Sequence, residues 1–177
     1  PGAGDPVGAS FPFIPQDAPL GLAPCVLIAT DFLGDDDFVM YLGDNLLEQD
    51  LGAFVHSFET ARAGTDPPTA QILLKQVPDP QRFGIAELDK HGNVVRLVEK
   101  PDNPPSDLAL VGVYLFDRTN NEAVRAIAPS PPGELEITDA IQWWVAQGKR
   151  ARRALLHGGG HDSGKRRPPT QANRQQP

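Results

Sequence analysis

A short apolar run at residues 38–42, followed by Gly43 and Asp44, constrains the fold of this chain more than any other feature. Acidic residues precede the run and glycine ends it, which is the pattern of a strand buried on both faces. We therefore expect a central strand at residues 37–42. Ligands of open α/β sheets bind just beyond the carboxyl ends of such strands, where Asp44 would lie. Taken alone, an Asp-Asn pair in that place is more often a turn than a metal site.

The rest of the chain alternates between strand and helix patterns. This alternation predicts an α/β fold, with a mixed, mostly parallel central sheet and flanking helices. We expect strands at residues 11–14, 70–77, 84–88, 94–99, 110–116 and 152–156, and helices at residues 20–32, 120–128 and 137–147. Residues 45–60 fit either type. The polar segment 89–93 predicts a hairpin with a longer loop, and Pro24 must lie in the first turn of its helix.

Composition limits the class of protein. The chain has 177 residues and a net charge of −7, which argues against a nucleic-acid binder. No apolar run approaches the ~20 residues that span a bilayer, so we predict no membrane association. The single Cys25 cannot form an internal disulfide, which favours a cytoplasmic location. We interpret residues 1–165 as one partial domain and residues 166–177 as a disordered tail.

Four motifs in order carry a resemblance to a known family. They lie at residues 14–23, 36–45, 98–101 and 133–140. The chain resembles the sugar-1-phosphate nucleotidylyltransferases, and most closely the glucose-1-phosphate thymidylyltransferases, from about residue 11 to residue 165. The resemblance implies a Rossmann-like nucleotidyltransferase fold and Mg²⁺-dependent transfer of a nucleotidyl group from dTTP to glucose-1-phosphate. The products would be dTDP-glucose, for deoxysugar synthesis in polysaccharide or antibiotic pathways, and pyrophosphate. UTP is the alternative nucleotide.

The chemistry of this transfer fits the absence of a Ser-His or Cys-His pair in these motifs. The attacking sugar phosphate is already anionic, because its second pKa is near ~6. Catalysis then depends on positioning, electrostatics and a magnesium ion that holds phosphate oxygens. The resemblance implies Asp44 and Asp162 as the Mg²⁺ ligands, and Lys100 and Asp44 as the catalytic residues. By residue type alone, both aspartates are ordinary loop residues.

The sugar-phosphate side of the site is implied at residues 84–114. Lys100 would neutralise the sugar phosphate, and Glu99 would accept hydrogen bonds from sugar hydroxyls. Without the resemblance, Lys100 is a solvated lysine and Glu99 a member of an ion pair. Gly84 would let the sugar approach the backbone. The further residues implied for this pocket are Leu110, Gly112 and Tyr114, of which Leu110 is equally compatible with a purely core position.

The base-recognition segment is implied at Gln16, Pro19, Gly21 and Leu22. The Gln16 amide offers a donor and an acceptor to a pyrimidine edge, and Gly21 leaves room for the base. On spacing alone the segment is a polar loop that leads into a helix.

The family's glycine-rich loop followed by Thr-Arg has no counterpart in residues 1–6. Such a loop cradles a triphosphate with backbone amides. We therefore expect the chain to begin after the phosphate loop and the first strands of the sheet. The alternative to an enzyme is a non-catalytic remnant that binds sugar phosphate. The expected partners are dTTP or UTP and glucose-1-phosphate, and the sequence leaves open whether the protein forms a homo-oligomer.

Overall fold

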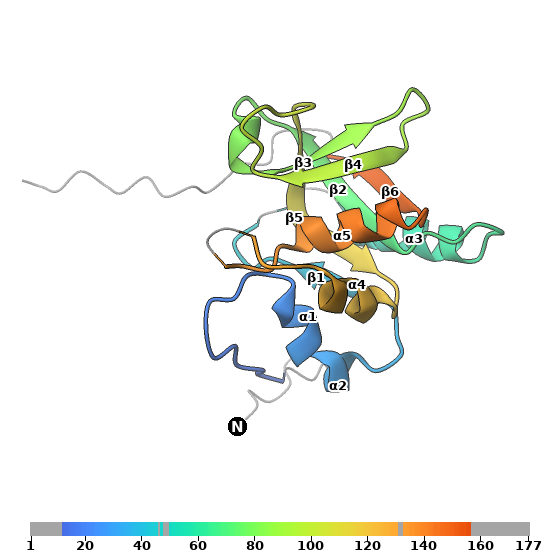
Figure 1. The fold of residues 1–177 in the computed structure, drawn as a ribbon. Coiled ribbons are helices and arrows are strands. Elements are labelled where there is room, and N and C mark those ends of the chain that lie inside the picture. Colours follow the sequence, from blue (N-terminus) through green and yellow to red (C-terminus); the bar gives the residue numbers. More distant parts are fainter. Residues whose placement is uncertain (1–11, 46, 48–49, 131–132, 157–177) are drawn as a thin grey trace, which may run out of the picture.

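A twisted sheet lies at the centre of the structure, with helices on both of its faces (Figure 1). The computed structural model describes residues 12–45, 47, 50–130 and 133–156. Within these residues the strands are β1 (Phe38–Tyr41), β2 (Ala70–Gln76), β3 (Gly84–Leu88), β4 (Val94–Glu99), β5 (Leu108–Phe116) and β6 (Ala151–Leu155). The helices are α1 (Pro24–Ile28), α2 (Thr30–Leu33), α3 (Leu51–Arg62), α4 (Asn120–Ala126) and α5 (Ile137–Ala146), with a 3₁₀ turn at Pro80–Arg82. The predicted tail and Asp162 lie outside the described residues.

The sheet is mixed, as predicted, but the expectation that it is mostly parallel is wrong for the described strands. The strand order is β4-β3-β5-β2-β6, and β1 also pairs with β5. Of the described pairs, only β2 with β6 is parallel. The reason is β5, which runs through the middle of the sheet against the direction of β1, β2 and β3. Strands β1, β2 and β3 therefore run in the same direction, but each of them pairs with β5 in the antiparallel sense.

One edge of β5 is shared by two strands. Strand β3 pairs with the beginning of β5, where Ile85 is opposite Ala109. Strand β1 pairs with the other end of β5, from Tyr41 opposite Val113 to Phe38 opposite Phe116. Strand β2 occupies the opposite edge along most of its length. The carboxyl end of β1 and the beginning of β3 are therefore brought to neighbouring positions on one strand.

The two faces of the sheet carry separate cores. On one face, side chains of β2 and β5 pack against α1, α4 and α5, with Ile72, Phe116, Val124, Ile141 and Trp144 at the centre. On the other face, Phe54 and Phe58 of α3 cover the alternate residues of β2 and β5. This arrangement follows from the period-two alternation of side chains along a strand.

Strand β1 differs from the expected central strand. Among the described residues it pairs only with β5, so it forms an edge of the sheet rather than its middle. Its burial alternates, and Val39 and Tyr41 are each 40% exposed. An apolar cavity of about 580 Å³ lies between this strand, α1, α2 and residues 12–14. Residues 12–14 are not a strand, since Pro12 and Pro15 cannot donate to a ladder.

The helix expected at residues 20–32 is divided into two short helices. The first, α1, begins at Pro24, which occupies the first helical position as predicted. Residues 20–23 are held instead by backbone bonds to Leu135, with Leu135 N donating to Leu20 O at 2.8 Å and Ala23 N to Leu135 O at 3.0 Å. The chain thus turns into α1 beside the loop before α5. No helix among the described residues is long and apolar enough to cross a membrane.

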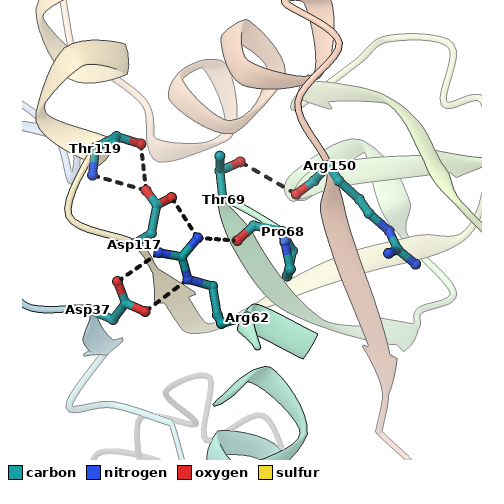
Figure 2. A network of polar contacts seen from close by, with 7 residues as sticks. All are labelled: Asp37, Arg62, Pro68, Thr69, Asp117, Thr119 and Arg150. Atoms are coloured by element: carbon teal, nitrogen blue, oxygen red, sulfur yellow. Dashed lines mark hydrogen bonds and ion pairs between the residues drawn. The ribbon is translucent and has the colours of Figure 1, made fainter. Parts of the chain in front are cut away.

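A polar network at the end of the sheet joins four elements (Figure 2). Arg62, the last residue of α3, donates to both carboxylate oxygens of Asp37 at 3.0 and 3.4 Å. Its Nη1 also donates to Asp117 Oδ2 at 3.2 Å and to Pro68 O at 3.3 Å. The backbone N–H of Thr119 donates to Asp117 Oδ1 at 3.0 Å. The network therefore connects the segments that enter β1 and β2 with the segment that leaves β5.

Candidate functional site

Glu99 and Lys100 lie side by side where β4 ends. The distance from Lys100 Nζ to Glu99 Oε1 is 3.4 Å, with side-chain exposures of 57% for the lysine and 18% for the glutamate. Lys100 has a φ of +39°, in the left-handed region that non-glycine residues rarely adopt. Its N–H donates to Phe83 O at 3.0 Å, which anchors this conformation. A cation that solvent can reach is thus held next to a half-buried carboxylate.

Thr138 holds the other oxygen of Glu99. The Thr138 hydroxyl donates to Glu99 Oε2 at 2.6 Å, from the second residue of α5. Gly84, opposite Glu99 in the β3–β4 ladder, lies directly against this contact. A Cβ at Gly84 would be 2.5 Å from Thr138 Oγ1 and 2.9 Å from Glu99 Oε2. Two side chains therefore fill the space beside Gly84, while its role of giving a sugar access to the backbone stays a prediction.

Further acidic residues surround this pair. Burial raises the pKa of Glu136, and the negative charge of Glu99 raises it further, while Lys100 opposes the shift. Burial and then Glu99 also raise the pKa of Asp139. The pKa of Lys100 is lowered by its partial burial, but the attraction of Glu99, Glu136 and Glu134 outweighs burial and leaves it raised. Lys100 therefore remains a cation at neutral pH, within a cluster that is negative overall.

The predicted base-recognition segment lies next to this cluster through the loop before α5. Gly21 has a φ of +97°, and a Cβ there would be 2.6 Å from Leu135 O. Glycine at position 21 is thus required for the contact with Leu135, and its role in leaving room for a base stays a prediction. The Gln16 amide donates to Gly21 O at 3.1 Å. Pro19 is exposed, and Leu22 is partly buried against the core.

Asp44 occupies a tight turn after β1, as predicted. Asn45 N donates to Leu42 O at 3.1 Å, with Gly43 and Asp44 between them. Leu42 N donates to Gly112 O at 2.9 Å, so the turn is attached to the middle of β5. A Cβ at Gly112 would collide with the side-chain amide of Asn45 and lie 2.7 Å from Leu42 Cδ1. Gly112 thus admits the turn that carries Asp44.

The structure brings the two predicted halves of the site to one edge of β5. The Asp44 turn bonds to Gly112, and β3 meets β5 at Ala109. The two attachment points are three residues apart on β5, and Glu99 and Lys100 lie one strand beyond β3, at the end of β4. Two other predicted pocket residues, Leu110 and Tyr114, are on the same face of β5 as Gly112 and are buried in the core. Burial raises the pKa of the Tyr114 phenol, and the charges of Glu99 and Glu136 raise it further.

The predicted magnesium site is only half described. Asp44 is exposed at its turn, whereas Asp162 lies outside the described residues. Among the described residues, no group of three His, Cys, Asp or Glu side chains is placed to hold a metal ion. Mg²⁺ usually takes one or two carboxylates and completes its shell with water and phosphate, so an exposed carboxylate such as Asp44 fits one such ligand.

Sequence reasoning missed three residues of this site, namely Glu136, Thr138 and Asp139. All three belong to the motif at residues 133–140, which supported the resemblance but received no role. The signal was available, because a helix that begins at residue 137 places positions 138 and 139 in its first turn. What the sequence does not show is that this turn packs against the end of β4.

A mixed sheet with helices on both faces defines an α/β fold. Comparison with known proteins agrees with this class. The chain belongs to the nucleotidyl transferase family, whose model matches residues 2–175.

Individual relatives give more detail. The chain is 51% identical over 163 residues to a glucose-1-phosphate thymidylyltransferase of Streptomyces griseus, covering 92% of this chain and 44% of that protein. It is 46% identical over 164 residues to a low-salt glycan biosynthesis nucleotidyltransferase of Haloferax volcanii, covering 93% of this chain and 44% of that protein. A crystal structure from Bacillus anthracis, solved in complex with sucrose, superposes with a TM-score of 0.77 at 33% identity, covering 90% of this chain and 62% of that one. The chain thus spans less than half the length of the two curated relatives.

Proposed function

We propose that the protein transfers a nucleotidyl group from dTTP to glucose-1-phosphate, which yields dTDP-glucose and pyrophosphate. The observation that carries this proposal is the Glu99–Lys100 pair, a fixed carboxylate and an accessible ammonium at the end of β4. A hexose phosphate presents hydroxyl donors, which a carboxylate accepts, and an anion, which an ammonium neutralises. The 51% identity to a thymidylyltransferase favours dTTP over UTP.

Each residue has a task in this reaction. An anionic oxygen of the sugar phosphate attacks the α-phosphorus of dTTP, the new P–O bond forms, and the bond to the β-phosphate breaks to release pyrophosphate. Lys100 neutralises the attacking phosphate, so that two anions can approach each other. Glu99 accepts hydrogen bonds from the sugar hydroxyls and orients the ring. Gln16 and the neighbouring segment, with Pro19, Gly21 and Leu22, meet the base.

Asp44 is the described residue that would hold a magnesium ion, together with Asp162. Bound Mg²⁺ would supply charge neutralisation on the phosphates of the nucleotide. The exposed position of Asp44, at the edge of β5 that also receives β3, supports this assignment. The pathway that we propose for the product is sugar-nucleotide biosynthesis.

The test is pyrophosphate release from glucose-1-phosphate with dTTP and, separately, with UTP, in the presence of Mg²⁺. We expect dTTP to be preferred and Lys100→Ala to reduce turnover with either nucleotide. Preference for UTP would correct the nucleotide. Binding of glucose-1-phosphate without turnover, detected by calorimetry, would favour the sugar-phosphate-binding alternative. Absence of both would refute the proposal.

A further inference from the structure

Thr138 makes a contact that its position in a helix does not require. It is 2% exposed and is the second residue of α5. Hydroxyl residues at the start of a helix usually cap backbone N–H groups of that helix. Among the described residues, no side chain caps α5, and the Thr138 hydroxyl instead reaches a residue 39 positions earlier. An ionised carboxylate only accepts hydrogen bonds, so Thr138 must be the donor to Glu99.

The two oxygens of Glu99 are consequently in different environments. Thr138 donates to Oε2 at 2.6 Å, while Lys100 Nζ lies 3.4 Å from Oε1. A relaxed ammonium–carboxylate pair has a separation of about 2.7–2.9 Å. The Glu99–Lys100 pair is longer than this, whereas the bond from Thr138 to the other carboxylate oxygen is short. The absence of a side chain at Gly84 leaves the space that the Thr138 hydroxyl and this carboxylate oxygen occupy.

We propose that Thr138 is a positioning residue for sugar recognition. It holds Glu99 away from Lys100, so that Glu99 presents free lone pairs to sugar hydroxyls and Lys100 keeps its charge for the phosphate. This inference rests on the proposed function, because it assigns Glu99 to a sugar. Without the hydroxyl, Glu99 rotates toward Lys100 and the two side chains satisfy each other. Recognition of the sugar hydroxyls then weakens.

The experiment compares dissociation constants for glucose-1-phosphate and for its 2-deoxy and 3-deoxy analogues. In the unmodified protein, we expect one analogue to bind more weakly than glucose-1-phosphate, because it lacks a hydroxyl that Glu99 accepts. Thr138→Val keeps the shape of the side chain and removes the donor. It should weaken the binding of glucose-1-phosphate about ten-fold, which is the effect of one hydrogen bond to a charged group. The dissociation constant of that analogue should stay nearly unchanged. Thr138→Ser keeps the donor and should retain most of the discrimination.

The control is Thr119→Val, which removes a second threonine hydroxyl that donates to a carboxylate, that of Asp117, away from the site. It should lower the melting temperature without changing the ratio of the dissociation constants. This ratio is measured within one protein sample, so partial unfolding of Thr138→Val does not distort it. If Thr138→Val does not fold, Thr138→Ala provides the same measurement.

The outcomes separate the two proposals. A protein that binds none of the three compounds would overturn both the proposed function and the role of Thr138. Binding of glucose-1-phosphate with discrimination that Thr138→Val leaves intact would overturn the role of Thr138 alone. Equal weakening of all three compounds would likewise show that Thr138 only supports the fold.

Discussion

Arg62 and Asp117 form an ion pair at 3.2 Å that joins the last residue of α3 to the segment after β5 (Figure 2). The Asp117 side chain is 5% exposed and that of Arg62 is 26% exposed. Asp37, which precedes β1, bonds to the same guanidinium. The contact therefore attaches β1 to the rest of the sheet at the end opposite to the Asp44 turn, which makes it relevant to the site as well as to stability.

Arg62→Ala should destabilise the protein strongly. Removal of the arginine leaves the buried Asp117 carboxylate without its cation, which costs about 2–4 kcal/mol of unfolding free energy. Arg82→Ala is the matched control, because Arg82 pairs with Asp79 at 3.0 Å but is 71% exposed. Its effect should stay below about 1 kcal/mol. Urea unfolding measures both variants, and equal effects would contradict a structural role for the Arg62 network.

Lys100 allows backbone strain and charge to be separated. With φ at +39°, Lys100→Gly should relieve strain that Lys100→Ala retains, so the glycine variant should be the more stable of the two by about 1 kcal/mol. Both variants remove the ammonium. If Lys100 binds the sugar phosphate, both variants should weaken the binding of glucose-1-phosphate by about 1.5–3 kcal/mol or more. Thermal denaturation and calorimetry give the two quantities. Unchanged binding in both variants, with altered stability only, would return Lys100 to a structural residue.

Glu136 should make stability depend on pH. Burial and the charge of Glu99 raise its pKa above the ordinary value of 4.5, so the folded protein binds this proton more tightly than the unfolded chain. Its favourable contribution is complete below pH 4.5 and is lost as the pH rises through the folded pKa. Glu136→Gln should therefore raise the melting temperature at pH 7, with a gain limited by solvent screening to about 0.5 kcal/mol.

At pH 4 the advantage of Glu136→Gln should disappear, because Glu136 is then protonated in the unmodified protein. Glu122→Gln, an exposed acid in α4, is the control for the removal of one negative charge. A pH-independent gain in both variants would indicate a general charge effect rather than the cluster around Glu99.

Much of the fold could be predicted from local patterns. Strand β2, the β3–β4 hairpin and β5 have apolar runs bounded by proline, glycine or acidic residues, and helices α4 and α5 show helical spacing. What the sequence could not show is which strands pair. The direction of β5 relative to β1, β2 and β3 depends on contacts between distant segments. The position of β1 at an edge of the sheet depends on such contacts as well.

The site was predictable to the extent that its residues lie in motifs. Glu99, Lys100, Gly84 and Asp44 were identified. The structure attaches the Asp44 turn and β3 to the same edge of β5, and it places Glu99 opposite Gly84, one strand further out, at the end of β4. Thr138 was missed because its partner is 39 positions away. Gly21 and Gly84 are also required by protein neighbours, which a sequence does not reveal. Their predicted roles toward a ligand stay predictions.

Gly112→Ala tests whether the Asp44 turn and the Glu99–Lys100 pair act as separate halves of one site. The added methyl group would displace Asn45 and Leu42, and with them the turn that carries Asp44. Overpacking of this kind costs about 1–3 kcal/mol of stability. The Glu99–Lys100 pair depends on β3, β4 and α5 and should keep its geometry. Under the proposed function, nucleotidyl transfer should fall sharply while glucose-1-phosphate still binds.

Gly52→Ala is the control for this variant. Gly52 lies in the first turn of α3, where a Cβ would lie 3.1 Å from Oδ1 of Asp50, the N-cap of the helix, so alanine should change the stability by less than about 1 kcal/mol. Its turnover and its affinity for glucose-1-phosphate should match those of the unmodified protein. Calorimetry and pyrophosphate release are measured for both variants. If Gly112→Ala lost sugar-phosphate binding and turnover in equal proportion, the two halves would be coupled through β5, and the separation of the Asp44 turn from the Glu99–Lys100 pair would be wrong.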